Sequence, residues 1–375
     1  MTIDPARKAT ATARVRDAVQ QSIDAGAEIG VQVAAYLAGE ELVNISAGLA
    51  DRVTGRPVAQ DTLFNVYSVA KAISVTALHL QAERGLVDYD APVTRYWPEY
   101  GQNGKDKTTV RHIITHSSGA PQMPEGTTVE EMCDWDLMVS RLAALAPVAE
   151  PGTQATYQAI SHGWLVGEIV RRTDGSKRSF GQFIREDLGE PLKAPDLWIG
   201  VPASAVPRIA RLTNNNPLEQ RAGGHAAAMP MNLSLIPEVF ERPDVRAAEV
   251  ASVGGIFTAT SCARVWAMLA NGGELDGVRL LSADRVAAFN QPRKTPGLSD
   301  TVLMGRTVAI SEAGYWLGGP SGNPEAIYHP GAGGSFGWAD LDSKMAVAFC
   351  HNNMGSGGKS PIGAIAAALR DTLLG

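Results

Sequence analysis

Strand-like sequence is confined to the two ends of this chain, and this separation constrains the fold more than any other feature. Near the N-terminus, residues 29–37 form a largely apolar strand and residues 41–47 an alternating one. Near the C-terminus, residues 335–341 and 344–351 form an expected hairpin. The last of these segments is apolar enough for the centre of a sheet.

The middle of the chain differs from both ends. Residues from about 88 to 250 are richer in proline, glycine and short helical runs, such as 110–115 and 161–173. We therefore predict an α/β domain that is interrupted by a mostly helical insertion. The domain would comprise residues 1–87 and 251–375, and the insertion residues 88–250.

Other segments have clear helix or loop signals. Residues 9–25 and 361–374 are expected to form helices near the two ends of the chain. The segment 68–84 has no glycine or proline and is followed by Gly85, which is typical of a helix stop. Residues 213–232 show no clear period and predict a long surface loop.

Composition excludes several classes of function. A chain of 375 residues with 45% hydrophobic residues can bury a sizeable core. Its net charge of −6 provides no basic surface for nucleic acid or anionic lipid, and no apolar stretch is long enough to cross a bilayer. The start lacks the apolar segment of a secretory signal. The cysteines are three in number and far apart, so we expect reduced thiols in a cytoplasmic protein: Cys133, Cys262 and Cys350.

Ser68 and Lys71 are the clearest candidates for nucleophilic catalysis. A neutral serine hydroxyl is a poor nucleophile and needs an adjacent base and a site for the developing oxyanion. Residues three apart lie on one face of a helix, which places Lys71 beside Ser68. Desolvation would lower the lysine pKa toward neutrality and allow it to take the serine proton. The helix N-terminus also directs its positive dipole end at Ser68.

Two other serines match nucleophile motifs. Ser356 and Lys359 repeat the S-x-x-K spacing, but a glycine run offers no rigid geometry. Ser335 lies in G-G-S-F-G, which matches the G-x-S-x-G elbow of α/β-hydrolases. That elbow needs a helix after the serine, whereas a strand follows here, and the one later histidine, His351, is a single hairpin away. We interpret both matches as coincidental.

Four landmarks in a fixed order extend the interpretation of Ser68. Residues 62–100 contain S-V-A-K and G-L-V-D-Y-D-A-P-V, and T-V-R-H-I-I-T-H-S-S-G follows at 109–119. The segment 150–170 then carries Tyr157, and H-P-G-A-G-G begins at His329. This order resembles that of the β-lactamase-like serine hydrolases, which include class C β-lactamases and penicillin-binding proteins. The resemblance covers nearly the whole chain.

The resemblance implies an α/β (α+β) fold of the β-lactamase/transpeptidase-like type, with helices flanking an antiparallel sheet. It also implies that Ser68 becomes an acyl-enzyme while Lys71 and Tyr157 relay protons. Backbone N–H groups of Ser68 and Ala332 would form the oxyanion hole. Further candidates for substrate contact are His329 and Gly331 on the glycine-rich strand, Tyr67 beside the nucleophile, and Trp338 just beyond that strand.

Two departures from the family pattern bear on the substrate. The tyrosine motif of β-lactamases, Y-x-N, is Y-Q-A here, so Ala159 supplies no amide to hold a lactam or peptide side chain. The K-T-G motif begins with His329, and histidine is a weaker and conditional cation because its pKa is ordinarily near 6.5. Lysine at that position serves substrates that carry a carboxylate. Both changes favour neutral esters of small to medium size and resemble the cytoplasmic carboxylesterases of this family.

Several alternatives stay open at the level of the sequence. The same machinery could serve an acyltransferase, an amidase or a β-lactamase, because an acyl-enzyme can be intercepted by different acceptors. A non-catalytic ligand-binding scaffold is a further possibility, although Ser68, Lys71 and Tyr157 are all present. We expect a small-molecule ester as substrate and neither nucleic acid nor membrane as partner. The oligomeric state is open.

No cofactor or metal is expected. His112 and His116 lie four apart on a segment expected to be helical, a spacing that can chelate a metal. However, no third ligand of matching spacing accompanies them. His162, five residues after Tyr157, either lines the pocket or packs in the interior, and we favour packing.

Overall fold

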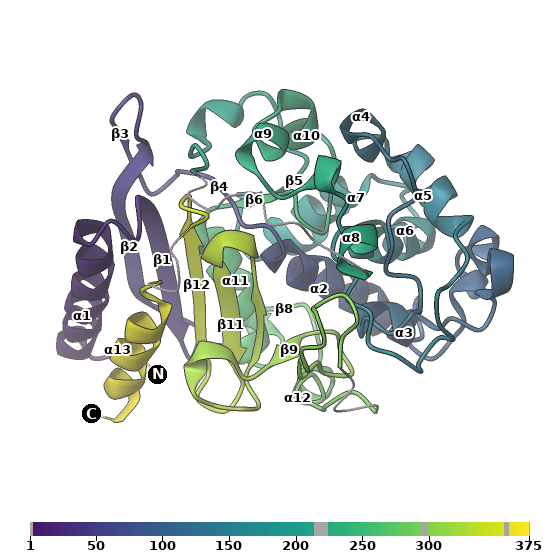
Figure 1. Ribbon diagram of the computed structural model, residues 1–375. Helices are drawn as coiled ribbons and strands as arrows, with labels where there is room; N and C mark the ends of the chain where they lie inside the picture. Colours follow the sequence, from purple (N-terminus) through teal and green to yellow (C-terminus); the bar gives the residue numbers. More distant parts are fainter. Residues whose placement is uncertain (1–2, 214–223, 295–298, 356–359, 375) are drawn as a thin grey trace.

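A seven-stranded antiparallel sheet joins the two ends of the chain (Figure 1). The structure, a computed structural model, describes residues 3–213, 224–294, 299–355 and 360–374. The strand order is β3-β2-β1-β12-β11-β10-β9. These strands are β1 (Gly30–Leu37), β2 (Glu40–Asp51), β3 (Arg56–Pro57), β9 (Trp316–Leu317), β10 (Ile327–Pro330), β11 (Phe336–Asp340) and β12 (Met345–His351).

The centre of the sheet is the pair of strands that are most distant in sequence. β1 and β12 run antiparallel, from Val31 opposite His351 to Leu37 opposite Met345. All of β12 and nearly all of β1 are buried, because helices cover both faces of the sheet. The predicted C-terminal hairpin is present as β11 and β12.

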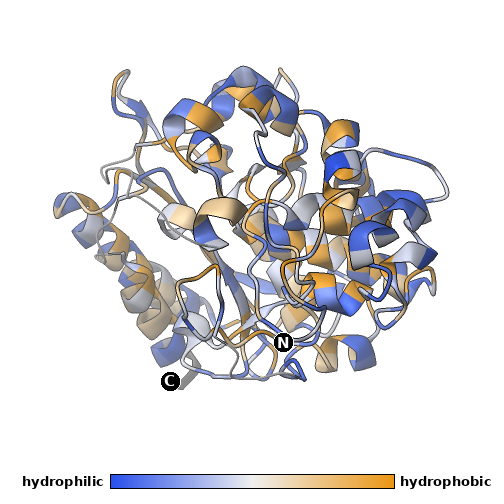
Figure 2. Cartoon of the chain, turned by 45° about the vertical axis from the view of Figure 1, so that its right-hand side comes forward, coloured by the Kyte–Doolittle hydropathy of each residue, from blue (hydrophilic) through white to orange (hydrophobic). Residues whose placement is uncertain are grey.

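Two separate apolar layers hold the sheet. On one face, β1 and β12 pack with α1 (Pro5–Asp24) and α13 (Ile362–Leu374), which lie on the left in Figure 1. On the other face, α11 (Ala259–Ala270) covers the sheet and joins the main core, which continues into the helical region. Most helices carry both hydrophobic and hydrophilic segments in Figure 2, as expected for helices with one buried side.

The helix α2 (Val69–Glu83) lies at the centre of the main core. Fourteen of its fifteen residues are buried, from Val69 to Ala82. It packs against α6 (His162–Thr173) of the helical region and also contacts β10 of the large sheet. A small sheet, in the order β4-β6-β5, supports its N-terminal end. Its strands are β4 (Phe64–Asn65), β5 (Leu197–Ile199) and β6 (Gly255–Phe257).

Short helices and turns make up most of the chain between α2 and β6. They include α3 (Val110–Ile114), α4 (Val129–Met132), α5 (Trp135–Ala143), α7 (Phe180–Phe183), α8 (Gly224–Ala228), α9 (Pro237–Phe240) and α10 (Pro243–Ala247). After α11 come β7 (Glu274–Leu275), β8 (Val278–Arg279) and α12 (Ala283–Ala287). The division into an α/β domain and an insertion stays a prediction, although the described strands of the large sheet all come from residues 30–57 and 316–351.

One expectation about this region was wrong in part. Residues 213–232 were expected to form a loop without regular structure, but α8 lies within them and the 3-10 turn η5 (Met231–Leu233) begins within them. The amide of Met123 donates to the carbonyl of Ala227, which ties α8 to the body of the protein. Residues 214–223 lie outside the described part of the chain.

The remaining global expectations concern thiols and membranes. Cys133, Cys262 and Cys350 are all free, as expected. Among the residues that the structure describes, no helix has both the length and the apolar character that crossing a membrane requires.

Candidate active site

Ser68 lies where a strained turn meets the start of α2. Tyr67 has φ = 48°, in the left-handed region that residues with a side chain seldom adopt. The side chain of Asn65 accepts the Tyr67 amide at 3.1 Å and holds this turn. Strain of this kind persists only where surrounding contacts fix it, and it is common at functional sites. The Ser68 side chain then lies at the positive end of the α2 dipole, and Ser68 is 7% exposed.

Lys71 is positioned to take the proton of Ser68. Its Nζ lies 3.0 Å from Ser68 Oγ, 2.7 Å from the carbonyl oxygen of Ala159 and 3.2 Å from that of Ser252. Burial lowers the pKa of Lys71 well below its ordinary value near 10.5, because desolvation penalises the charged form. A neutral amine has two N–H groups and one lone pair. The two carbonyls can accept both N–H groups, which leaves the lone pair facing the serine hydroxyl.

Tyr157 completes this group from a segment without regular secondary structure. Its ring lies 5.1 Å from Lys71 Nζ, and its hydroxyl is close enough to the Ser68 side chain for that side chain to lower the phenol pKa. Burial raises the pKa of the Tyr157 hydroxyl above its ordinary value of 10. Desolvation therefore favours the neutral form of both partners, so that Lys71 is suited to accept a proton and Tyr157 to donate one.

The glycine-rich turn after β10 lies against the backbone that precedes the nucleophile. This turn, η7 (Ala332–Gly334), follows Gly331, and a side chain at Gly331 would lie only 2.2 Å from the carbonyl oxygen of Val66. The backbone that carries Ala332 is therefore in direct contact with the backbone that leads into Ser68. This contact supports the expectation that the N–H groups of Ser68 and Ala332 form the oxyanion hole.

The Gly331→Ala variant tests this placement. We expect its kcat to fall by about 10²–10³-fold, the usual cost of losing an oxyanion donor, because the new methyl group would displace Ala332. The matched control is Gly363→Ala in α13, where an added Cβ meets no atom within 4 Å. Both variants should be assayed for ester hydrolysis, with circular dichroism to verify folding. A near-normal rate in Gly331→Ala would remove the turn from the oxyanion site.

Comparison with known proteins places this arrangement in a family. The family described as Beta-lactamase matches residues 15–371 of the chain. The chain belongs to the Beta-lactamase family. It is also 34% identical over 343 residues to a Mycobacterium tuberculosis protein named Esterase/beta-lactamase LipL, across 87% of this chain and 77% of that protein.

Two solved structures of similar sequence confirm the predicted β-lactamase/transpeptidase-like fold. A family VIII carboxylesterase is 32% identical with a TM-score of 0.87, across 96% of this chain and 97% of that one. A penicillin-binding protein homolog from Caulobacter crescentus is also 32% identical with a TM-score of 0.87, across 99% of each chain.

His329 replaces the lysine that begins the family's K-T-G motif, and the structure shows it buried. Its Nδ1 lies 2.8 Å from the carbonyl oxygen of Pro330, so Nδ1 carries the proton. Its ring packs on Trp316 at 5.2 Å. Burial, assisted by the nearby Lys71, lowers the pKa of His329 to about 3. The imidazole is therefore uncharged at neutral pH, and this member of the Beta-lactamase family lacks a cation at that position.

Two histidines that the sequence did not assign to the site lie around Tyr157. The His116 ring is 4.7 Å from the Tyr157 ring and 4.6 Å from the His162 ring. Burial is the main cause that lowers the pKa of both histidines. The H-S-S-G sequence after α3 marks a turn, but nothing in it indicates that this turn reaches the tyrosine.

The spacing of His112 and His116 was interpreted on the wrong secondary structure. α3 ends at Ile114, and His116 adopts a left-handed backbone with φ = 55°. His112 instead accepts the amide of Thr109 and caps the helix start. The two imidazoles therefore have different roles: His112 caps α3, and His116 packs against Tyr157. In the described ranges, no group of three or more histidine, cysteine or acidic side chains is placed to hold a metal.

The two aromatic candidates for substrate contact are placed differently. Tyr67 is buried beside Ser68, with its ring 5.4 Å from Phe240 and its hydroxyl 2.9 Å from Met354 Sδ. Trp338 lies in the layer between the sheet and α1 and α13, on the far face from the site. Successive residues of a strand point to opposite faces, and it is Gly337 that faces α11. The structure therefore excludes Trp338 from the pocket.

The competing serines do not form a second site in the described structure. Ser335 is 1% exposed and is followed by the strand β11, not by a helix. Its Oγ accepts the backbone amide of His351 at 3.4 Å, while the His351 ring pairs with Glu28 at 2.7 Å. The second S-x-x-K match at residues 356–359 lies outside the described residues.

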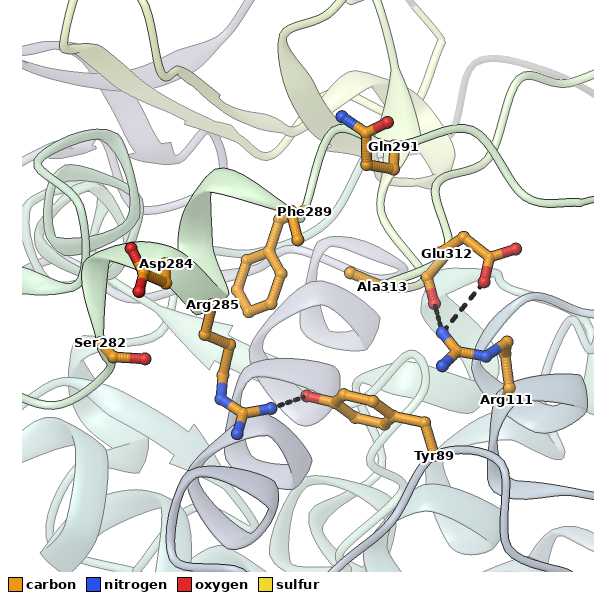
Figure 3. A pocket seen from close by; sticks show the side chains of 10 residues that line it. Tyr89, Arg111, Ser282, Asp284, Arg285, Phe289, Gln291, Glu312 and Ala313 are labelled. Carbon is orange, nitrogen blue, oxygen red and sulfur yellow. Dashed lines mark hydrogen bonds and ion pairs between the residues drawn. The ribbon is translucent and has the colours of Figure 1, made fainter.

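A cavity of about 550 Å³ lies elsewhere on the molecule (Figure 3). Its lining comes from Tyr89, from Arg111 of α3, and from residues in and around α12 and at 312–313. Its two arginines are already paired, Arg111 with Asp90 and Glu312, and Arg285 with Glu83. Both arginines of the lining are therefore engaged in ion pairs, and none of the lining residues belongs to the Ser68, Lys71 and Tyr157 group.

Proposed function

We propose that this protein is a serine hydrolase that cleaves small to medium neutral carboxylic esters through an acyl-enzyme on Ser68. The names of its relatives, an esterase/beta-lactamase and a family VIII carboxylesterase, support ester hydrolysis as the reaction class. The contacts among Ser68, Lys71 and Tyr157 support the steps below.

In the acylation step, Ser68 Oγ bonds to the ester carbon as Lys71 accepts the hydroxyl proton. The carbonyl oxygen becomes an oxyanion held by the N–H groups of Ser68 and Ala332. When the intermediate collapses, the carbon–oxygen bond to the alcohol breaks, and Tyr157 gives its proton to the departing oxygen. The proton on Lys71 then restores the phenol. The alcohol leaves, and the acyl group remains on Ser68 as an ester.

Deacylation runs through the same groups in reverse. A water molecule bonds to the acyl carbon as its proton passes to Lys71, directly or through Tyr157. The bond to Ser68 Oγ then breaks, and that proton returns to the serine. Each group is restored at the end, and the products are one alcohol and one carboxylic acid.

The uncharged state of His329 is the main reason to expect a preference for uncharged substrates. A lysine at this position would pair with a substrate carboxylate, whereas a buried, uncharged imidazole would leave that carboxylate desolvated without a partner. Ala159 adds to this preference because it offers no amide for a lactam side chain. A cytoplasmic location remains part of the proposal, supported by the free thiols of Cys262 and Cys350.

A matched pair of esters tests the proposed substrate class. We expect kcat/KM for p-nitrophenyl butyrate to exceed that for mono-p-nitrophenyl succinate by at least about tenfold, since an unpaired buried charge costs more than about 1.4 kcal/mol. The two esters share their leaving group, so the comparison isolates the acyl-chain carboxylate. Nitrocefin serves as the lactam comparison, because one relative is named as both esterase and beta-lactamase. A preference for nitrocefin or for the succinate would contradict the proposal.

A further inference from the structure

The backbone around Tyr157 is held by contacts from distant parts of the chain. Three successive amides donate outside their own segment. Thr156 N donates to the carbonyl of His116 at 2.8 Å, and Gln158 N donates to His116 Nδ1 at 3.3 Å. Between them, Tyr157 N donates to the Asp300 carboxylate, 2.9 Å from Oδ2 and 3.2 Å from Oδ1. Because no helix or strand fixes this segment, these contacts set the position of the tyrosine.

Asp300 is itself built into a rigid turn. Its Oδ1 also accepts the amides of Val302 at 2.8 Å and Leu303 at 3.0 Å. The adjacent Thr301 amide donates to the carbonyl of Ala155 at 3.2 Å. Asp300 is only 2% exposed, so the carboxylate has exchanged water for backbone N–H groups. Its orientation is therefore determined before Tyr157 contacts it.

A buried arginine, Arg293, lies close enough to Asp300 to feel its charge. Arg293 is 4% exposed, and the Asp300 carboxylate opposes the fall in its pKa that burial causes. Arg293 Nη1 donates to the carbonyl of Thr115 at 3.1 Å, next to His116.

We propose that Asp300 is a positioning residue for Tyr157 and that it keeps the phenol aligned with Ser68 and Lys71. This inference rests on the proposed function, because it assigns Asp300 a part in the same acyl transfer. Asp300 touches no reacting atom; it acts by fixing the main chain of Tyr157. Displacing a catalytic group by about 1 Å can cost about 10²-fold in rate, so this restraint should be visible in kcat.

Two variants separate the Tyr157 contact from the turn. In Asp300→Asn, the amide oxygen can still accept Val302 and Leu303 and keeps the longer, 3.2 Å contact with Tyr157 N. The NH₂ group replaces the nearer acceptor, Oδ2, and faces the Tyr157 amide, donor against donor. In Asp300→Ser, the shorter hydroxyl can still accept the amide of Val302 and keep the turn, but it cannot reach Tyr157. The matched control is Asp51→Asn, because Asp51 accepts Val53 N and Thr54 N in a similar turn away from the site.

The decisive measurement is a double-mutant cycle with Tyr157→Phe. We expect Asp300→Asn to lower kcat for p-nitrophenyl butyrate by about 10²-fold with KM within threefold. In the Tyr157→Phe background, the same change should have little further effect, because Asp300 acts by positioning the Tyr157 hydroxyl, which this background lacks. A role in folding alone would lower activity equally in both backgrounds. Asp51→Asn should retain the wild-type kcat. Equal losses in both backgrounds, or none in either Asp300 variant, would overturn the proposal.

A second readout keeps this test separate from the proposed substrate. The rate at which a fluorophosphonate labels Ser68 depends on the same proton transfers but on no particular ester. We expect Asp300→Asn and Tyr157→Phe to slow labelling by similar factors, and the double variant to be no slower than Tyr157→Phe. If the wild-type protein is labelled but hydrolyses no ester, the proposed function fails while the labelling cycle still decides the role of Asp300. Additive effects on labelling would contradict that role.

Discussion

Ser68→Ala should abolish ester hydrolysis while leaving the protein folded. We expect kcat to fall by roughly 10⁵–10⁶-fold, the scale seen when a serine nucleophile is removed, because no acyl-enzyme can form. The substitution removes one small hydroxyl, whose hydrogen-bond partner is Lys71 Nζ, and leaves the apolar side chains of the core around α2 unchanged. The measurement is turnover of p-nitrophenyl butyrate, together with thermal unfolding by circular dichroism.

Ser335→Ala is the matched control for this experiment. It removes a hydroxyl that is at least as buried as that of Ser68 and lies in the G-x-S-x-G sequence, but whose Oγ accepts the backbone amide of His351. We expect its kcat to stay within a few-fold of the wild type. Intact-mass and peptide mapping after fluorophosphonate treatment should give one adduct, on Ser68, in the wild type and in Ser335→Ala. An adduct on Ser335 would show that Ser335 is the nucleophile and that the assignment of Ser68 is wrong.

Lys71→Ala should be the next most damaging change. We expect a loss of about 10³–10⁴-fold in kcat, near the upper end of what a general base contributes, since Ser68 loses the group that accepts its proton. Lys105 offers a matched control, because it is also buried and donates to the carbonyls of Gln102, Ala143 and Leu145. Lys105→Ala should lower the thermal stability but leave kcat within a few-fold of normal.

The pH dependence of the wild-type enzyme provides a second test of Lys71. Burial lowers the pKa of Lys71, so the amine loses its proton at a pH well below 10.5. The active form is the neutral amine, and activity should therefore fall as the pH drops through this lowered pKa. Ionisation of Tyr157 should cause no loss of activity below pH 10, because burial raises the pKa of its phenol. An activity that appears only near pH 10.5 would show that Lys71 remains charged.

The two opposite pKa shifts have one physical cause. Burial penalises the ammonium of Lys71 and the phenolate of Tyr157 alike, so it selects a neutral base and a neutral acid next to one hydroxyl. Groups whose pKa values are driven apart in this way mark the acid and base of a site. The site therefore needs no carboxylate to activate Ser68. Asp300, the buried carboxylate nearest the tyrosine in the described structure, contacts its main chain instead.

The sequence by itself determined the parts of the site that depend on local geometry. Ser68 and Lys71 are three residues apart on one helix, so helical geometry alone brings them together. The strands of the central sheet were likewise predictable, because β1 and β12 are apolar over nearly their whole length. The order of four motifs located Tyr157 and the Ala332 turn, although 89 residues separate Ser68 from the tyrosine.

Only the tertiary structure decided which face each residue occupies and what surrounds it. Both faces of the sheet are covered, so the strand with Trp338 shows no alternation of polar and apolar residues, and the sequence could not assign the tryptophan to a side. The same limit applies to His329, whose lowered pKa results from burial by several elements. Asp300 reaches Tyr157 across 143 residues of sequence. Local sequence patterns report neighbours along the chain, whereas burial and hydrogen bonding depend on residues that only folding brings together.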